Sequence, residues 1–156
     1  MAKWLSSQYG WPLAEEYARH YLEHDGHIQD AKALINVAKA QVAAEVYAAA
    51  GDKHKVLICD SDMLVLYIWC TDKFHKVPPA LSALVKHHAY DLTMLCVPDI
   101  PWIPDPHRVN PLDRARLFNQ YKTELIKMGR LFVEIKGDQG QRKQLAEKSI
   151  TQLLKA

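Results

Sequence analysis

The chain alternates between short runs of apolar residues and longer segments whose apolar residues recur at helical spacing. Runs with strand character cover residues 55–59, 91–97 and 131–135, and the first two are apolar over most of their length. A continuous apolar run of this length is typical of a strand covered on both faces, as in a parallel sheet. The segment 11–15 is also expected to be extended, because its Trp-Pro pair resists helix formation.

Helices are predicted between these strands, where apolar residues recur every three or four positions. The longest, residues 29–50, is rich in alanine and places Gln41, Glu45 and Val46 in phase with its apolar residues. Glycines end several of these segments, and a pair of prolines begins one. The predicted helices cover residues 2–9, 16–24, 29–50, 63–70, 79–88, 112–128 and 139–154.

Strands that alternate with helices indicate an α/β fold, in which a parallel sheet is covered by helices on both faces. In such folds ligands bind beyond the carboxyl ends of the strands. Acidic residues follow three of the predicted strands: Glu15-Glu16, residues 60–62 and Asp99. We therefore expect the chemistry at these strand ends. The proline-rich segment 98–111 is expected to be a loop.

The composition fits one soluble globular domain. The 156 residues are 49% hydrophobic and 24% charged, and the net charge of +2 is spread along the chain, so nothing demands a nucleic acid or a membrane as partner. The cysteines Cys59, Cys70 and Cys96 are odd in number and lack CxxC spacing, which favours reduced thiols over a zinc site. Without a signal peptide or a long apolar span, a cytoplasmic location is expected.

Four segments, in this order, carry a resemblance to a known family. They are "EYAR" at 16–19, "AKAQVAAE" at 38–45, "ICDSD" at 58–62 and "PWIPDPHR" at 101–108. Together they resemble the P-loop kinase domain of NadR-type ribosylnicotinamide kinases and related small AAA-type ATPases. The resemblance implies a three-layer P-loop domain over residues 1–156. It also implies transfer of the ATP γ-phosphate to the 5′-hydroxyl of nicotinamide riboside with Mg²⁺, a step of NAD biosynthesis.

The resemblance also implies a first strand and a glycine-rich loop before the segment that begins at Met1. No GxxxxGK[ST] motif occurs in the 156 residues, so we expect this chain alone not to turn over ATP. The strands at 55–59 and 91–97 would flank the missing strand and keep unpaired backbone groups. Two explanations stand: a fragment whose start lies upstream, which we favour, or a degenerate protein that closes the gap by oligomerising.

The resemblance assigns roles to the acidic strand ends. Glu16 would take the proton of the substrate hydroxyl, and Asp60 and Asp62 would hold magnesium. Each has a simpler alternative, because carboxylates at these positions also cap helices or favour the helix dipole. Arg19 would bind substrate or phosphate, or would pair with Glu16 or Glu15.

The resemblance places a lid at about residues 99–116. Asp105 would contact substrate there, and Arg108 would reach the ATP phosphates, with Arg114 and Arg116 as further nucleotide-binding candidates. Prolines at 104 and 106 depart from the family pattern and weaken the assignment of Asp105 most.

Aromatic residues are the candidates for stacking on the pyridine ring of the substrate. Tyr17 and Trp102 are both considered, against the alternative of ordinary packing, and Trp102 is favoured because it lies in a loop. The resemblance leaves two rival functions open: a general ATPase or other small-molecule kinase, and a non-catalytic binding module. The second would use the remaining sheet edges or the lid region to bind a partner or a second copy of the chain.

Overall fold

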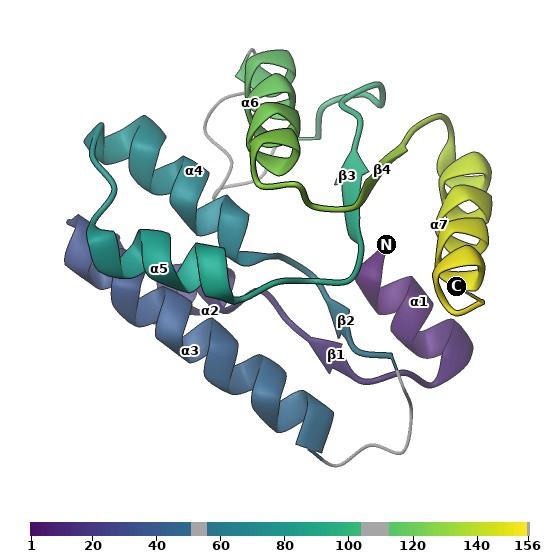
Figure 1. Ribbon diagram of the computed structural model, residues 1–156, viewed down its shortest axis with the longest axis horizontal. Coiled ribbons are helices and arrows are strands. Elements are labelled where there is room, and N and C mark those ends of the chain that lie inside the picture. Colours follow the sequence, from purple (N-terminus) through teal and green to yellow (C-terminus); the bar gives the residue numbers. More distant parts are fainter. Residues whose placement is uncertain (51–55, 104–112, 156) are drawn as a thin grey trace. The chain divides into compact units, whose positions relative to one another are not determined.

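The computed structural model (Figure 1) describes residues 1–50, 56–103 and 113–155, and its contacts divide the chain into two compact units. The first unit is Met1–His88 and the second is Ala89–Ala156. Each unit contains one pair of parallel strands with helices packed against it.

The first unit holds five helices and two strands among its described residues. In chain order they are α1 (Ala2–Tyr9), β1 (Leu13–Ala14), α2 (Tyr17–Asp25), α3 (Ala31–Ala50), β2 (Ile58–Cys59), α4 (Met63–Phe74) and α5 (Pro79–His87). Helix α1 ends at Gly10, whose φ of 68° is left-handed and therefore suits glycine. Helix α5 begins with Pro79, whose missing N–H has no partner to lose at a helix start.

Strands β1 and β2 are parallel, and their register brings the two carboxyl ends to the same edge. Leu13 is opposite Ile58 and Ala14 is opposite Cys59. The Asp60 N–H donates to the Ala14 carbonyl at 2.9 Å, so the pairing continues into the acidic residues that follow both strands.

The core of the first unit surrounds α3, which packs against α2, α4, α5 and β1. Helix α4 is apolar on most of its surface, and five of its residues are buried: Met63, Leu64, Leu66, Ile68 and Cys70. Burial of a leucine side chain of this kind contributes about 1.5–3 kcal/mol. This core fixes the strand ends that precede α2 and α4.

The second unit has two strands and two helices among its described residues. They are β3 (Thr93–Cys96), α6 (Arg114–Lys127), β4 (Phe132–Ile135) and α7 (Gln139–Leu153). The strands are parallel, with Thr93 opposite Phe132 and Cys96 opposite Ile135. Helix α6 packs against β3 and α7 against β4, around a core that includes Leu125 and Ile135.

The parallel α/β character expected from the sequence is confirmed, and a helix or strand lies in each predicted range, although β1 and β2 have only two residues each among the described residues. The described strands form two sheets of two strands, β1-β2 and β3-β4, and neither β2 nor β3 has a strand on its second edge among the described residues. Two details were wrong. Helix α4 continues to Phe74 instead of ending near Cys70, and Val46 is 63% exposed although it was expected on the apolar face of α3.

In the part of the chain that the structure describes, no helix combines the length and the apolar composition needed to cross a bilayer.

Candidate functional site

The carboxylates expected at the strand ends lie along the edge formed by β1 and β2. Glu16 is the N-cap residue of α2 and makes no side-chain capping bond. Asp60 is exposed, and its carboxylate has no hydrogen bond or ion pair with any described residue. Glu15 is turned to solvent and pairs with Lys3 at 2.9 Å. Glu16 and Asp60 therefore lie at the same edge of this strand pair, each just after the carboxyl end of its strand.

Asp62 serves the start of α4. Its Oδ1 accepts the N–H of Leu64 at 2.9 Å and that of Val65 at 3.3 Å, so it satisfies two donors that have no partner within the helix. Capping is therefore an established role of Asp62 in this fold. Asp60, whose carboxylate has no such task, is the better oxygen ligand of the two.

Arg19 faces Glu16 across one turn of α2, with 3.9 Å between Arg19 Nε and Glu16 Oε2. Both side chains are partly exposed, so this contact contributes little to stability. Tyr17 directly follows Glu16, and its ring lies 5.6 Å from that of His20. Three residues predicted for the substrate site, Glu16, Tyr17 and Arg19, thus share the first turn of one helix.

A buried polar chain lies behind this turn, and the sequence had assigned no role to its members. The Tyr17 N–H donates to Gln41 Oε1 at 2.7 Å, and Gln41 Nε2 donates to Glu45 Oε1 at 3.1 Å. His88 Nε2 lies 2.6 Å from Glu45 Oε2. The signal was available: Gln41 and Glu45 are polar residues at core-facing positions of α3, where they are 3% and 4% exposed.

Cys59 ends β2 among these carboxylates. Burial, and next the negative charges of Glu45 and Asp62, raise the pKa of the Cys59 thiol to about 12. This thiol is therefore neutral at physiological pH and is not a nucleophile there.

Trp102 and Arg114, which the sequence placed in two different roles, are in contact in the second unit. The Arg114 guanidinium carbon lies 5.9 Å from the centre of the Trp102 ring, and its NH2 donates to the Ile100 carbonyl at 2.8 Å. Arg116 instead pairs with Asp113 and Gln120 along the exposed side of α6. Asp105 and Arg108, with Pro104 and Pro106, lie outside the described residues.

Asp99, at the end of β3, is held in a clamp. One carboxylate oxygen accepts the Gly137 N–H at 2.7 Å, and the other accepts from Arg142. Arg142 is 7% exposed and also donates to the Val97 and Gly137 carbonyls. The Gly137 N–H, and next the Arg142 charge, hold the pKa of Asp99 below its usual value. This carboxylate locks the ends of β3 and β4 together.

Comparison with known families decides the class of the protein. A family model described as an AAA domain matches residues 1–142. The chain belongs to this AAA domain family. Membership supports nucleotide binding of the P-loop NTPase type and an AAA-like α/β domain. No curated protein matches the chain.

Magnesium fits the AAA domain's strand-end residues in chemistry, because carboxylate oxygens are the ligands it prefers and it needs only one or two from the protein. Asp60 offers such a carboxylate. Among the described residues no group of three or more His, Cys, Asp and Glu side chains is arranged to hold a metal, so a protein-only cage is not indicated there.

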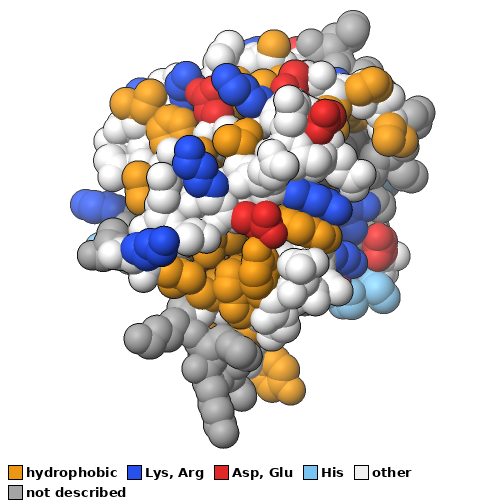
Figure 2. All heavy atoms as spheres, turned by 90° about the vertical axis from the view of Figure 1, so that its right-hand side faces the viewer, with side chains coloured by type: hydrophobic (Ala, Val, Ile, Leu, Met, Phe, Trp, Pro, Cys, Tyr) orange, Lys and Arg blue, Asp and Glu red, His pale blue; other side chains and the backbone are white. Residues whose placement is uncertain are grey.

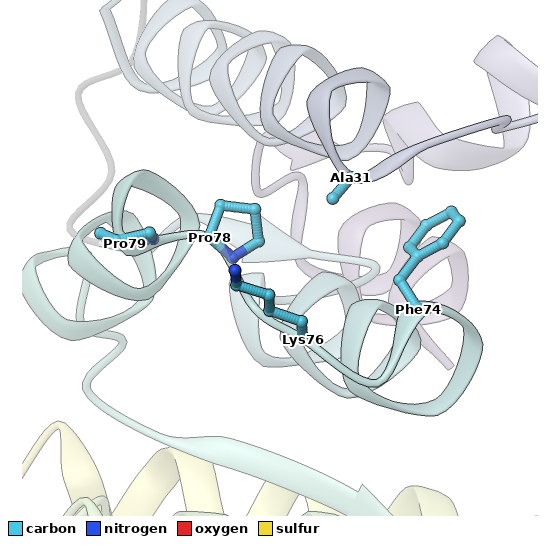
Figure 3. A pocket seen from close by; sticks show the side chains of 5 residues that line it. All are labelled: Ala31, Phe74, Lys76, Pro78 and Pro79. Carbon is cyan, nitrogen blue, oxygen red and sulfur yellow. The ribbon is translucent and has the colours of Figure 1, made fainter.

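Two hollows in the surface of the AAA domain are lined by residues other than Glu16 and Asp60. One, of about 470 Å³, is lined by Ala31, Phe74, Lys76, Pro78 and Pro79 (Figure 3). Another, of about 510 Å³, lies beside the Asp99 clamp and includes Lys136 and Lys148. Figure 2 shows basic and acidic side chains interspersed on one face, in keeping with the small net charge.

Proposed function

We propose that the chain acts in ATP-dependent phosphorylation of a small nucleoside-like molecule, with nicotinamide riboside as the acceptor. The observation that carries the proposal is the register of β1 and β2, which brings Glu16 and Asp60 to one edge. Parallel strand ends are where α/β proteins bind ligands. A proton acceptor next to a magnesium ligand is what transfer of a phosphoryl group to a hydroxyl requires.

The roles divide among the residues as follows. Glu16 would accept the proton of the hydroxyl, and Asp60 would hold Mg²⁺ directly or through water. Arg19 and Tyr17 would contact the acceptor from the same helical turn, and Asp62 would assist the metal in addition to capping α4. Bound Mg²⁺ supplies charge neutralisation for the ATP phosphates.

The lid at about residues 99–116 is proposed from the resemblance to the kinase family alone. Trp102 would stack on the cationic pyridine ring, although Arg114 already lies over the Trp102 ring and would have to give way or share it. Arg108, Arg114 and Arg116 would stabilise the transferred phosphoryl group, and Asp105 would contact the acceptor.

The phosphate cradle sets the limit of this proposal. The 156 residues contain no GxxxxGK[ST] motif, whose backbone N–H groups and lysine contact the β- and γ-phosphates. We therefore expect the chain by itself to bind the acceptor without turning over ATP.

A non-catalytic binding module is the second candidate. The observation that favours it is the second edge of β2 and of β3, which pairs with no strand among the described residues. Such edges can bind another chain by β-strand addition.

The test has two stages. Titration calorimetry first measures binding of nicotinamide riboside to the chain, with uridine and adenosine as competitors for specificity. A segment with a strand and a GxxxxGK[ST] loop is then fused ahead of Met1, and phosphorylation of nicotinamide riboside is measured with Mg²⁺ and ATP.

Matched variants separate the roles. We expect Glu16→Gln and Asp60→Asn to lower kcat of the fused chain at least ~100-fold, whereas Glu15→Gln, at the neighbouring exposed carboxylate, changes it less than about threefold. No acceptor binding and no phosphorylation by the fused chain would reject the kinase proposal and leave the binding module.

A further inference from the structure

The start of α2 lacks a cap of its own, and another helix supplies what it needs. The first N–H groups of a helix have no partner within the helix, and a side chain of the N-cap residue normally accepts one of them. Glu16 makes no such bond. Instead Gln41, on α3, accepts the Tyr17 N–H at 2.7 Å.

Gln41 is itself fixed by a second buried side chain. Its Nε2 donates to Glu45 Oε1 one turn further along α3, and the other Glu45 oxygen accepts from His88 Nε2. The amide oxygen of Gln41 can only accept and its nitrogen can only donate. The two bonds therefore hold the Gln41 amide in one orientation, with its oxygen toward Tyr17.

Packing alone does not account for these residues. Gln41 and Glu45 are 3% and 4% exposed, and a buried carboxylate loses its hydration. An apolar side chain of similar volume would pack α3 against its neighbours without that cost. The polar chain is better explained by what it holds at its end, which is the turn that carries Glu16.

We propose that Gln41 and Glu45 are positioning residues for Glu16. They fix the backbone at the β1-α2 junction and so set where the Glu16 carboxylate points. The inference rests on the proposed function in naming Glu16 as the proton acceptor, whereas the chain of bonds itself concerns only the fold of the first unit.

The first readout is hydrogen exchange of the Tyr17 amide, measured by NMR on the whole chain. Since an amide at the first position of a helix has no helical partner, its protection reports the Gln41 bond directly. We expect Gln41→Met to raise the exchange rate at least ~10-fold. The same substitution at an exposed glutamine, Gln152→Met, should leave it unchanged.

An exchanged pair of side chains gives the decisive test. Gln41→Glu alone sets two carboxylates against each other and should lose the protection. Combining Gln41→Glu with Glu45→Gln restores every bond, because the carboxylate at position 41 then accepts from Tyr17 and from the amide at position 45. The oxygen of that amide in turn accepts from His88. We expect this double variant to recover protection to within about threefold of the starting chain.

The His88 ring gives an independent spectroscopic readout. A carboxylate accepts only, so Nε2 of His88 carries the proton in the starting chain. The ¹⁵N shifts of the ring distinguish this form. The pattern of a ring protonated at Nε2 should persist in the double variant, where an amide oxygen at position 45 is the acceptor in place of the carboxylate.

Binding and turnover separate the two proposals. In the fused chain, Gln41→Met should lower kcat ~10-fold or more with KM changed less than about threefold, and the double variant should recover kcat. Unchanged Tyr17 exchange in Gln41→Met, or no recovery in the double variant, would overturn the positioning role. The Tyr17 exchange rates could instead behave as expected while the chain neither binds nor phosphorylates nicotinamide riboside. That outcome would keep the positioning role and reject Glu16 as a proton acceptor.

Discussion

Asp60 and Asp62 lie two positions apart at the end of β2, and the fold uses them differently. Asp62 accepts two backbone N–H groups at the start of α4, whereas the Asp60 carboxylate has no hydrogen bond or ion pair among the described residues. A carboxylate engaged in capping contributes to stability, and one without such a bond is available to a ligand. Substitution at the two positions should therefore separate folding from binding.

We expect Asp62→Ala to lower the free energy of unfolding by about 1 kcal/mol, because the Leu64 N–H loses its acceptor and the Val65 N–H keeps only the Asp62 carbonyl. Asp62→Asn keeps an acceptor and should cost only about 0.3 kcal/mol. Asp60→Asn should change stability by less than about 0.5 kcal/mol. Urea denaturation measures all three, and equal stability of Asp62→Ala and the starting chain would contradict the capping role.

The Asp99 clamp predicts a pH dependence of stability. The pKa of Asp99 is held below its ordinary value of 3.8, so the ionised form stabilises the folded chain. This contribution is complete above the ordinary pKa and is lost as the pH falls through the lower folded value. As the pH is lowered from about 5 to about 2.5, the free energy of unfolding of Asp99→Asn should therefore fall less than that of the starting chain.

Urea midpoints at several pH values provide the measurement for Asp99. Asp91→Asn, at an exposed carboxylate, is the matched control and should follow the starting chain. An Asp99→Asn variant whose acid sensitivity equals that of the starting chain would show that the clamp does not depend on the charge.

At the scale of elements, α2 and α7 begin in contrasting ways. Helix α7 has its own capping box: Asp138 accepts the Gln141 N–H, and the Gln141 side chain accepts the Asp138 N–H. At the start of helix α2, the Tyr17 N–H is accepted by Gln41, which belongs to α3. The start of α7 is thus capped by its own sequence, whereas the acceptor at the start of α2 comes from a helix packed against it.

Gly137, just before α7, should not tolerate a side chain. Its φ of 87° is left-handed, and an added Cβ would collide with the Gln141 side chain of the capping box. Gly137→Ala should therefore destabilise the chain by about 1–3 kcal/mol. Gly140→Ala adds a Cβ 3.3 Å from the exposed Asp138 carboxylate, a milder contact, and should change stability by less than about 1 kcal/mol. Thermal unfolding of the two variants gives the comparison.

At the scale of the whole molecule, each strand of the two parallel pairs has one edge that faces away from its partner strand. The N–H groups of Thr93 and Val97 donate to the chain segment of β4, at 3.0 and 2.9 Å. Because alternate residues of a strand bond to opposite sides, the N–H groups of Met94 and Cys96 point to the other edge of β3. That edge pairs with no strand among the described residues, and edges of this kind attract other strands.

The chain should consequently self-associate in a concentration-dependent way. Cys96 is exposed, and a lysine there would place a charge on the open edge. We expect Cys96→Lys to shift the equilibrium toward monomer at least about fivefold, while Cys96→Ser does not. Sedimentation velocity under reducing conditions decides this, and a chain that is monomeric at every concentration would exclude association through the edge.

The order and type of the elements could be predicted from the sequence, because apolar period, glycine stops and proline starts are local signals. The placement of Glu16 and Asp60 at strand ends followed from the same signals. Gln41 and Glu45 stand out as polar residues at core-facing positions, but their partners Tyr17 and His88 lie 24 and 43 positions away along the chain and could not be predicted. The same holds for Arg142 and Asp99, which are 43 positions apart. The exposure of Val46 could not be predicted either. Helical periodicity shows which residues share a face of α3, but it does not show how much of that face other elements cover.

The neutral thiol of Cys59 has a consequence for metal selectivity. A thiolate beside carboxylates would favour Zn²⁺ and other soft cations, which bind such mixed sites more tightly than Mg²⁺ does. With a pKa of about 12, Cys59 holds roughly a thousandfold less thiolate at a given pH than a thiol of ordinary pKa 9.0. Under the proposal that Asp60 holds Mg²⁺, the burial that packs β2 would therefore also keep a competing thiolate away from that metal ligand.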